Sequence, residues 1–308
     1  MNCIVYIDRK TGKYAVEKVY GAEAIRLLYG HTLSSRLFGA PLAYFSARFP
    51  LFSALYGYFQ KTRCSRKKIA PFITTYEVDA SEFADPVESF DSFNDFFIRK
   101  LKPEARPIAP GDDTAIIPAD GRYLFYQDIS KADGFIVKGE KFELVDLLGD
   151  PKLAAQFEKG TMIIARLCPS DYHRFHFPCN CVPGIPRLIN GFLYSVNPMA
   201  LKQNVAIFTQ NRRVLTELET DNFGKVLYME VGATNVGTIH ETFTPGVPVK
   251  KGEEKGYFSF GGSALILLFQ EGKLQLDSDL TGHPHMEIRC LLGQSMGKAT
   301  APKTGTSH

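Results

Sequence analysis

The sequence has no tryptophan, few cysteines and histidines, and almost no net charge. Its 36 lysines and arginines nearly balance 33 aspartates and glutamates, which leaves a formal charge of +3. So small a charge gives no clustered basic surface for nucleic acid, and no nucleic-acid partner is expected. Six cysteines in 308 residues are too few for a disulfide scaffold. With 44% hydrophobic and 22% charged residues, the composition is that of an ordinary globular protein and excludes intrinsic disorder.

Long apolar runs are also missing. No stretch reaches the roughly 18 consecutive apolar residues of a membrane-spanning helix, so the chain is not expected to cross a membrane. The first residues, MNCIVYIDRKTGKYAVEKV, contain no apolar h-region of the kind that a secretory signal needs. They predict two short strands joined by a turn at Gly12, and the thiols are expected to be reduced and cytoplasmic.

Aromatic and basic residues are concentrated near the N-terminus. Residues 22–72 carry apolar side chains at helical spacing, and Pro41 and Pro50 divide them into short helices. Glu23 is the single acid in this zone, whereas its basic residues include a cluster of five, Lys61, Arg63, Arg66, Lys67 and Lys68. Such amphipathic helices are typical of a segment that lies on a lipid surface. The alternative is that their apolar faces pack on the rest of the fold.

The remaining chain predicts an α+β body with mainly antiparallel strands. A helix is expected at 89–101, with Ser92 as its cap, and others at Leu144–Leu148 and 151–157. From residue 115 onward, short β-type runs are broken by Gly and Pro, and GFLYSV (191–196) and AIFTQ (206–210) are among the predicted strands. We therefore divide the chain into an N-terminal strand-turn and membrane-facing helical region, 1–86, and a catalytic domain, 87–308.

Two segments carry side chains suited to catalysis. In PADG, Asp120 precedes a glycine after an apolar run, a pattern that is most often turn chemistry. In DYHRFHFP, His173 and His176 lie three residues apart. They would face opposite sides of a strand, but in a turn or helical bend both could line one cavity. Core or loop histidines remain the alternative for this pair.

A zinc site is another interpretation of the same region. Together with Cys179 and Cys181, the two histidines form the pattern H-x-x-H-x-x-C-x-C, and imidazole and thiolate both suit zinc. The spacing argues against it, because structural zinc sites normally use two short ligand pairs separated by a longer loop. No metal is therefore predicted.

The segment GYFSFGGSALILLF places two glycines and Ser263 at the start of a strand-like run. A glycine-rich hairpin or bulge would explain this pattern. The alternative is a strained Gly–Ser bond whose hydroxyl points at the preceding carbonyl. The segment lacks the G-x-S-x-G of a nucleophile elbow, because Ala264 is followed by Leu265.

In combination, these segments resemble the phosphatidylserine decarboxylase family of pyruvoyl-dependent enzymes, in its prokaryotic form. The resemblance runs in the family's order over about two-thirds of the chain. It rests on FNDFFIRKLKPEARPI (93–108), PADGR (118–122), VKGEKFELVDLLGD (137–150), RLCPSDYHRFHFP (166–178), FTQNRRV (208–214), VGATNVGTIHETF (231–243) and EKGYFSFGGSALILLF (254–269). One position departs from the pattern, because the family usually has Thr or Ser where Ala264 follows Ser263. The reactive serine is present, but the hydroxyl that would follow it and support self-processing is missing.

The resemblance implies that the protein is made as a zymogen and cuts itself between Gly262 and Ser263. His176 would act as general base on the Ser263 hydroxyl and would be held in the right tautomer by Asp120. The products would be chains 1–262 and 263–308, the second starting with a covalent pyruvoyl group made from Ser263. That group would form a Schiff base with phosphatidylserine and release CO₂ to give phosphatidylethanolamine. His173 would polarise or protonate the intermediate.

A phospholipid substrate also implies where the protein works. We expect peripheral attachment to the cytoplasmic side of the cell membrane, and a homodimer of processed chains. Other interpretations are the same chemistry on another serine-headed lipid or a small amino acid, a non-catalytic β-rich binding module, and a serine hydrolase that uses Asp120, His176 and Ser263 without cleavage. The module and the hydrolase both predict an uncut chain of 34.4 kDa.

Overall fold

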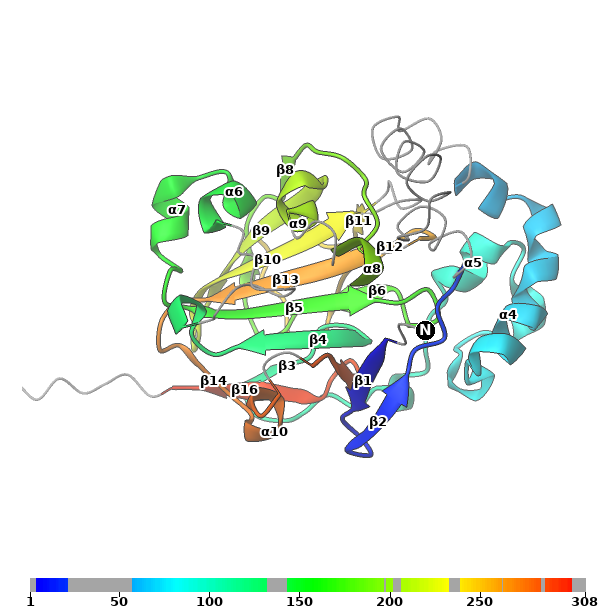
Figure 1. Ribbon diagram of the computed structural model, residues 1–308, viewed down its shortest axis with the longest axis horizontal. Helices are drawn as coiled ribbons and strands as arrows, with labels where there is room; N and C mark the ends of the chain where they lie inside the picture. Colours follow the sequence, from blue (N-terminus) through cyan, green and yellow to red (C-terminus); the bar gives the residue numbers. More distant parts are fainter. Residues whose placement is uncertain are drawn as a thin grey trace, which may run out of the picture.

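The computed structural model describes residues 4–21, 57–131, 143–196, 198–201, 206–232, 239–261, 263–283 and 286–300. In this part of the chain one large β-sheet and two small ones are surrounded by short helices (Figure 1). The strand pairs are antiparallel except for β1 with β15. The predicted α+β class and the mainly antiparallel body are confirmed.

The large sheet has ten strands within the described residues. Their order is β2 (Lys13–Val16), β1 (Val5–Asp8), β15 (Ile288–Cys290), β4 (Gly121–Tyr126), β5 (Thr161–Leu167), β13 (Ser263–Phe269), β10 (Gly224–Gly232), β9 (Arg213–Thr220) and β7 (Val182–Pro183), with β8 (Arg187–Ile189) also on β9. The small sheets have the orders β11 (Ile239–Glu241), β12 (Glu254–Phe258), β6 (Arg174–His176) and β14 (Leu274–Leu276), β16 (Ser295–Ala299), β3 (Thr114–Ile116).

Strand β13 lies in the middle of the large sheet and is buried on both faces. It pairs with β10 and β5 along its whole length, and every one of its residues is buried. Side chains alternate between the faces of a strand. Ile266 and Leu268 therefore join one hydrophobic cluster, and Leu265 and Leu267 join another on the opposite face. The period of two places Ser263 on the same face as Leu265.

Different elements cover the two faces of this sheet. Helices cover the face of Ile266, and the two small sheets cover the face of Leu265. The covering helices are α6 (Leu144–Leu148), α7 (Pro151–Ala155), α8 (Pro198–Leu201) and α9 (Ile207–Gln210), which lie along one side of the sheet in Figure 1. Ser263 therefore faces the layer that contains β12 and β6, and β6 begins directly after His173 and ends with His176.

A third cluster lies beside the N-terminal strands. It is built by the helices α4 (Ile69–Tyr76) and α5 (Phe93–Phe97) together with Phe260, close to the predicted cleavage site. The Ser92 side chain accepts a hydrogen bond from the Asp95 N–H, so the predicted cap is confirmed. The Ser65 hydroxyl accepts a bond of 2.8 Å from the Phe93 N–H and joins the preceding 3₁₀ helix η2 (Arg63–Lys68) to α5.

The predicted amphipathic N-terminal helices are not confirmed. Residues 22–56, where most of them were expected, lie outside the described residues. In α4 the apolar side chains of Ile69 and Phe72 are buried in the third cluster, so this face packs on the fold rather than on lipid. No helix in the described part of the chain is long and apolar enough to span a bilayer. The division into domains at residue 86 stays a prediction. Strand β1, from the first predicted domain, pairs with β15, from the second.

Some local predictions are confirmed and others are wrong. The turn at Gly12 joins β1 to β2, and helices α6 and α7 lie where they were expected. The helix expected at 89–101 is limited to the five residues of α5. The run 206–210 contains the helical turn α9 instead of a strand, because one turn buries both Ile207 and Phe208 against the sheet. The run 191–196 makes only an isolated bridge at Phe192.

The two-sided burial of β13 predicts a large effect of cavity formation there. Leu267→Ala should lower the free energy of unfolding by about 3 kcal/mol, because the side chain is fully buried between layers. The matched change Leu188→Ala, on a side chain that is 45% exposed, should cost less than about 1 kcal/mol. Urea denaturation of the uncut Ser263→Ala background measures both. Equal losses would contradict the central position of β13.

Candidate active site

Within the described part of the chain, three polar atoms of the candidate residues are buried without a hydrogen-bond partner. They are Ser263 Oγ, His173 Nε2 and His176 Nε2. A buried polar group left unpaired costs about 1–3 kcal/mol, and a native structure keeps such groups only for a reason. Here they belong to the three residues that the sequence proposed as nucleophile and bases. Each is therefore available to a reacting group.

Ser263 is held rigidly at the first position of β13. It lies opposite Leu167 of β5 and Gly232 of β10, and its exposed fraction is 0%. Two residues earlier, Gly261 has φ of +144°, a conformation that side chains with a Cβ rarely adopt. Gly262, the other partner of the predicted cleavage, lies outside the described residues. The backbone thus enters β13 through a turn that requires glycine.

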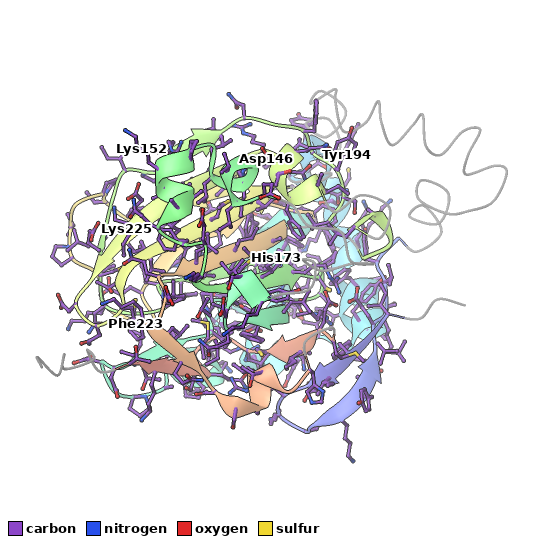
Figure 2. The ribbon with its side chains drawn as sticks, turned by 60° about the vertical axis from the view of Figure 1, so that its left-hand side comes forward. Asp146, Lys152, His173, Tyr194, Phe223 and Lys225 are labelled. Atoms are coloured by element: carbon purple, nitrogen blue, oxygen red, sulfur yellow. The ribbon has the colours of Figure 1, made fainter. Side chains whose placement is uncertain are left out.

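His173 lies in the loop that follows β5, in the interior of the molecule (Figure 2). Its Nδ1–H donates to the Asp171 carbonyl oxygen at 2.9 Å, which leaves Nε2 as the basic nitrogen. The ring packs on Phe97 with centroids 3.9 Å apart. Its backbone carbonyl accepts a bond of 3.0 Å from Phe258, five residues before Ser263. Burial lowers the pKa of His173 to about 4, so the ring is neutral at physiological pH.

His176 is the last residue of β6 and is fixed in the same way. Its Nδ1–H donates to the Gly252 carbonyl oxygen at 3.0 Å, and no described residue is a partner of Nε2. The ring stacks on Tyr172 at 6.0 Å. Burial lowers the pKa of His176, while the charges of Glu254 and Asp120 act in the opposite direction. Both histidines therefore present a neutral, basic Nε2.

Asp120 does not hold His176 as expected. Its carboxylate is bound by Arg106 at 2.6–3.1 Å and by the Leu292 N–H at 2.8 Å. Since Arg106 occupies both carboxylate oxygens, the Gly252 carbonyl sets the tautomer of His176 instead. Asp120 acts on His176 through its charge, which favours the protonated ring.

The zinc interpretation finds no support in the geometry. Cys179 and Cys181 are buried in the cluster that contains Leu265, and burial raises the pKa of the Cys181 thiol to about 12, which disfavours the thiolate a metal needs. Among the described residues, no three His, Cys, Asp or Glu side chains are grouped as metal ligands.

Comparison with known proteins agrees with this geometry. A sequence model of the phosphatidylserine decarboxylase family matches residues 93–298. The chain is 48% identical to the phosphatidylserine decarboxylase proenzyme of Chlamydia pneumoniae over 296 residues, which cover 96% of this chain and 97% of that protein. The chain belongs to the phosphatidylserine decarboxylase family. Proteins of the same name from Chlamydia caviae (48% over 301 residues, 97% and 99% covered) and Chlamydia trachomatis serovar L2 (45% over 297, 96% and 97% covered) are also similar.

The family assignment confirms the resemblance seen in the motifs and the enzyme class, a decarboxylase. The names of these relatives also agree with the expectation that the protein is made as a precursor. The roles of Asp120, His173, His176 and Ser263 stay predictions, because membership of a family does not by itself assign a role to a residue.

The sequence missed the residues that support these groups. Arg106, which binds Asp120, lies in the segment 93–108 but had no assigned role, because nothing local shows that it reaches a carboxylate 14 residues later. Lys255 is fully buried, with Nζ 2.7 Å from Glu230 and 2.9 Å from Glu241. This ion cluster ties β12 to β10 next to the segment that leads to Ser263. Its signal in the sequence is Glu230, an acid inside the apolar run VLYMEVGA, whereas Lys255 itself follows the charged run KKGEE.

Ala264 also has a definite place. It is fully buried and belongs to the cluster on the helix-covered face, whereas Ser263 faces the other side of the sheet. A Thr hydroxyl at this position would therefore point away from the Ser263 side chain and into an apolar layer.

The environment of His173 predicts a pH dependence. Because the folded pKa lies below the ordinary value of 6.5, the unfolded chain takes up the proton first as the pH falls. The contribution of neutral His173 to stability is complete above about pH 6.5 and is lost as the pH falls toward 4. Relative to Ser263→Ala/His173→Gln, the Ser263→Ala protein should lose about 2–3 kcal/mol between pH 7 and 4.5. If the free energy of unfolding changed equally with pH in the two proteins, that result would contradict a buried, neutral His173.

Proposed function

We propose that this chain is a proenzyme that cuts its own backbone between Gly262 and Ser263 and then converts phosphatidylserine to phosphatidylethanolamine. The observation that carries the proposal is the buried hydroxyl of Ser263 at the start of β13, which has no partner among the described residues and follows two residues after Gly261, a glycine in the left-handed region. A hydroxyl that served only a turn would be hydrogen-bonded or solvated. The names of the relatives support the substrate and the precursor form.

Self-cleavage uses residues of this chain alone. His176 Nε2 takes the Ser263 hydroxyl proton, and Oγ attacks the carbonyl carbon of residue 262. The C–N bond breaks as the amine is protonated, so the amide becomes an ester. Loss of the α-proton of residue 263 then expels the residue-262 carboxylate and leaves dehydroalanine. Water converts this to a pyruvoyl group with release of ammonia. The negative charge of Asp120 stabilises His176 while it carries the proton.

The surroundings of Ser263 fit a pyruvoyl group. The position is dry, lies at a chain end after cleavage, and has two neutral histidines in the neighbouring layer. The group supplies an electron sink for the carbanion left by CO₂. His173 would hold the proton that is returned to the substrate carbon, since its Nε2 is basic and unpaired. The rings of Phe97 and Phe260, 4.9 Å apart, exclude water from this side.

Intact mass under denaturing conditions tests the cleavage. The processed protein should give chains 1–262 and 263–308, the second blocked at its start and lighter than a serine start by about the mass of ammonia. Ser263→Ala should give one chain. The matched control is Ser259→Ala, because the Ser259 hydroxyl already pairs with His240 Nε2 at 3.1 Å. This control should still be cut. A folded wild-type chain that remains uncut would contradict the proposal.

We also propose peripheral attachment to the cytoplasmic side of the cell membrane, and a homodimer of processed chains. Tyr58 and Phe59 are 66% and 56% exposed, next to the exposed basic side chains of residues 61–68. Aromatic and basic side chains together favour an anionic lipid surface. Ser65 ties this segment to α5 from its buried side, which leaves the charges outside.

Charge reversal tests the membrane surface. Lys61→Glu/Lys67→Glu should reduce sedimentation with vesicles that contain anionic lipid by at least about tenfold, because each basic residue contributes about 1 kcal/mol at such a surface. The control Lys152→Glu/Lys159→Glu makes the same charge change at exposed positions in and after α7. It should keep most of the binding. An equal loss in both variants would mean that overall charge, and not this surface, attracts the protein.

A further inference from the structure

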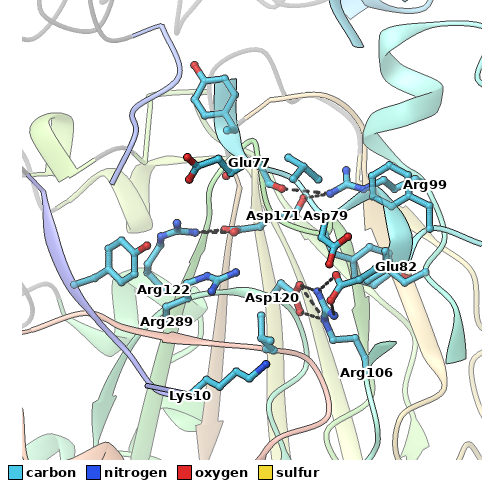
Figure 3. Close-up of a pocket in the computed structure, with 18 residues that line it drawn as sticks. Lys10, Glu77, Asp79, Glu82, Arg99, Arg106, Asp120, Arg122, Asp171 and Arg289 are labelled. Carbon is cyan, nitrogen blue, oxygen red and sulfur yellow. Dashed lines mark hydrogen bonds and ion pairs between the residues drawn. The ribbon is translucent and has the colours of Figure 1, made fainter. Parts of the chain in front are cut away.

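A cavity of about 370 Å³ lies beside Asp120 (Figure 3). Its walls come from the β1–β2 hairpin, the end of α4, the segment after α5, and the loop that leads to His173. The cavity is rich in charge. Its lining cations are Lys10, Arg99, Arg106, Arg122 and Arg289, and its lining acids are Glu77, Asp79, Glu82, Asp120 and Asp171.

Most of these charges are already paired. Arg106 binds Glu82 and Asp120. Arg122 binds both oxygens of Asp171 at 2.5–2.7 Å, and Arg289 binds Asp8 outside the cavity at 2.9 Å. The remaining two acids are exposed, with Glu77 paired to Lys18 and Asp79 capping the helical turn that follows it. The deep acids are therefore neutralised by their own arginines.

Arg99 is different. It is 4% exposed and has no carboxylate partner among the described residues. Its hydrogen bonds, to the carbonyl oxygens of Phe96, Ser170 and Asp171, are long, at 3.3–3.4 Å, and its Nε has no partner within the described ranges. The guanidinium lies over the rings of Phe83 and Phe96 at about 5 Å. Burial lowers its pKa to about 10, so it still carries its charge at physiological pH.

Arg213 shows what a satisfied arginine looks like in the same protein. It is also buried, also lacks a carboxylate partner among the described residues, and also has its pKa lowered to about 10 by burial. Its Nε donates to the Leu147 carbonyl oxygen at 2.8 Å, and its other nitrogens reach three further carbonyl oxygens at 2.5–2.9 Å. Arg213 is a structural arginine with short bonds, whereas Arg99 has weak bonds and borders a cavity.

Arg99 is also connected to the candidate active site. The Asp171 carbonyl oxygen that accepts from Arg99 is the one that accepts from His173 Nδ1. The helix α5, which ends next to Arg99, holds the Phe260 N–H through the Asn94 side chain at 3.0 Å. The cavity wall thus reaches His173 through one carbonyl group, and the helix that leads to Arg99 holds the segment that precedes Ser263.

We infer that Arg99 binds the phosphate of the phospholipid head group in this cavity, an inference that rests on the proposed function. A buried cation with unused donors suits an anion, and the head group offers a carboxylate and a phosphate. The carboxylate is the poorer candidate, because a cation that stabilises it would oppose its loss as CO₂. The phosphate keeps its charge throughout the reaction. Arg99 would then contribute uniform binding, which lowers KM and leaves kcat nearly unchanged.

Steady-state kinetics on dihexanoyl phosphatidylserine test this assignment. Arg99→Gln should raise KM at least about tenfold with kcat within about threefold of wild type, and Arg99→Lys should restore part of the loss because it keeps the charge. Arg213→Gln should melt at a lower temperature but keep the wild-type KM. An unchanged KM in Arg99→Gln, or a fall in kcat alone, would overturn the assignment.

A binding experiment separates this inference from the proposed function. Calorimetry with the uncut Ser263→Ala protein should detect glycerophosphoserine, and the added Arg99→Gln change should abolish the signal. If inorganic phosphate binds Arg99 as tightly as glycerophosphoserine does, the cavity is a free-phosphate site and the head-group assignment is wrong. If wild-type protein is uncut or does not decarboxylate phosphatidylserine, the proposed function fails instead. Mass analysis of Arg99→Gln should still show two chains.

Discussion

The burial of β13 on both faces is the constraint on which the rest of the structure depends. The side chains of β13 are apolar except for that of Ser263, which is its first residue. The alternation of side chains then decides which layer the hydroxyl faces. Because helices cover one side and small sheets the other, Ser263 faces the layer that carries His173 and His176. The sheet that stabilises the fold also keeps this hydroxyl dry and unpaired.

Burial also determines the protonation state of the two histidines. Each uses Nδ1–H to satisfy a backbone carbonyl, and each leaves Nε2 unpaired. Burial lowers both pKa values, so the rings are neutral bases rather than cations. An imidazole that is neutral at rest can accept a proton when a nearby hydroxyl gives one up. A carboxylate hydrogen-bonded to either ring would have favoured the charged form instead.

The buried arginines have two different functions: some hold carboxylates in place, and Arg99 is the candidate for binding substrate. Arg166 of β5 bonds to Glu17 and Glu287 at 2.6 Å and so links the end of the N-terminal hairpin to the central strands of the large sheet. Arg106 holds the Asp120 carboxylate in place beside the site. Paired arginines of this kind are closed to a ligand. Arg99 lines a cavity, has long hydrogen bonds and has an Nε without a partner among the described residues, which are the properties expected of a substrate-binding cation.

The amino-acid sequence by itself determined the fold class, the β1–β2 turn, helices α6 and α7, and the identity of the reactive candidates, because these depend on local pattern and on motifs. It did not determine the fate of ambiguous short runs such as 206–210, where burial against the sheet decided between helix and strand. Nor did it determine the partner of Asp120 or the environment of Arg99. These depend on contacts between residues distant in the chain, such as Leu292 with Asp120. Only the tertiary structure brings such groups together, since packing and not sequence proximity chooses which donor meets which acceptor.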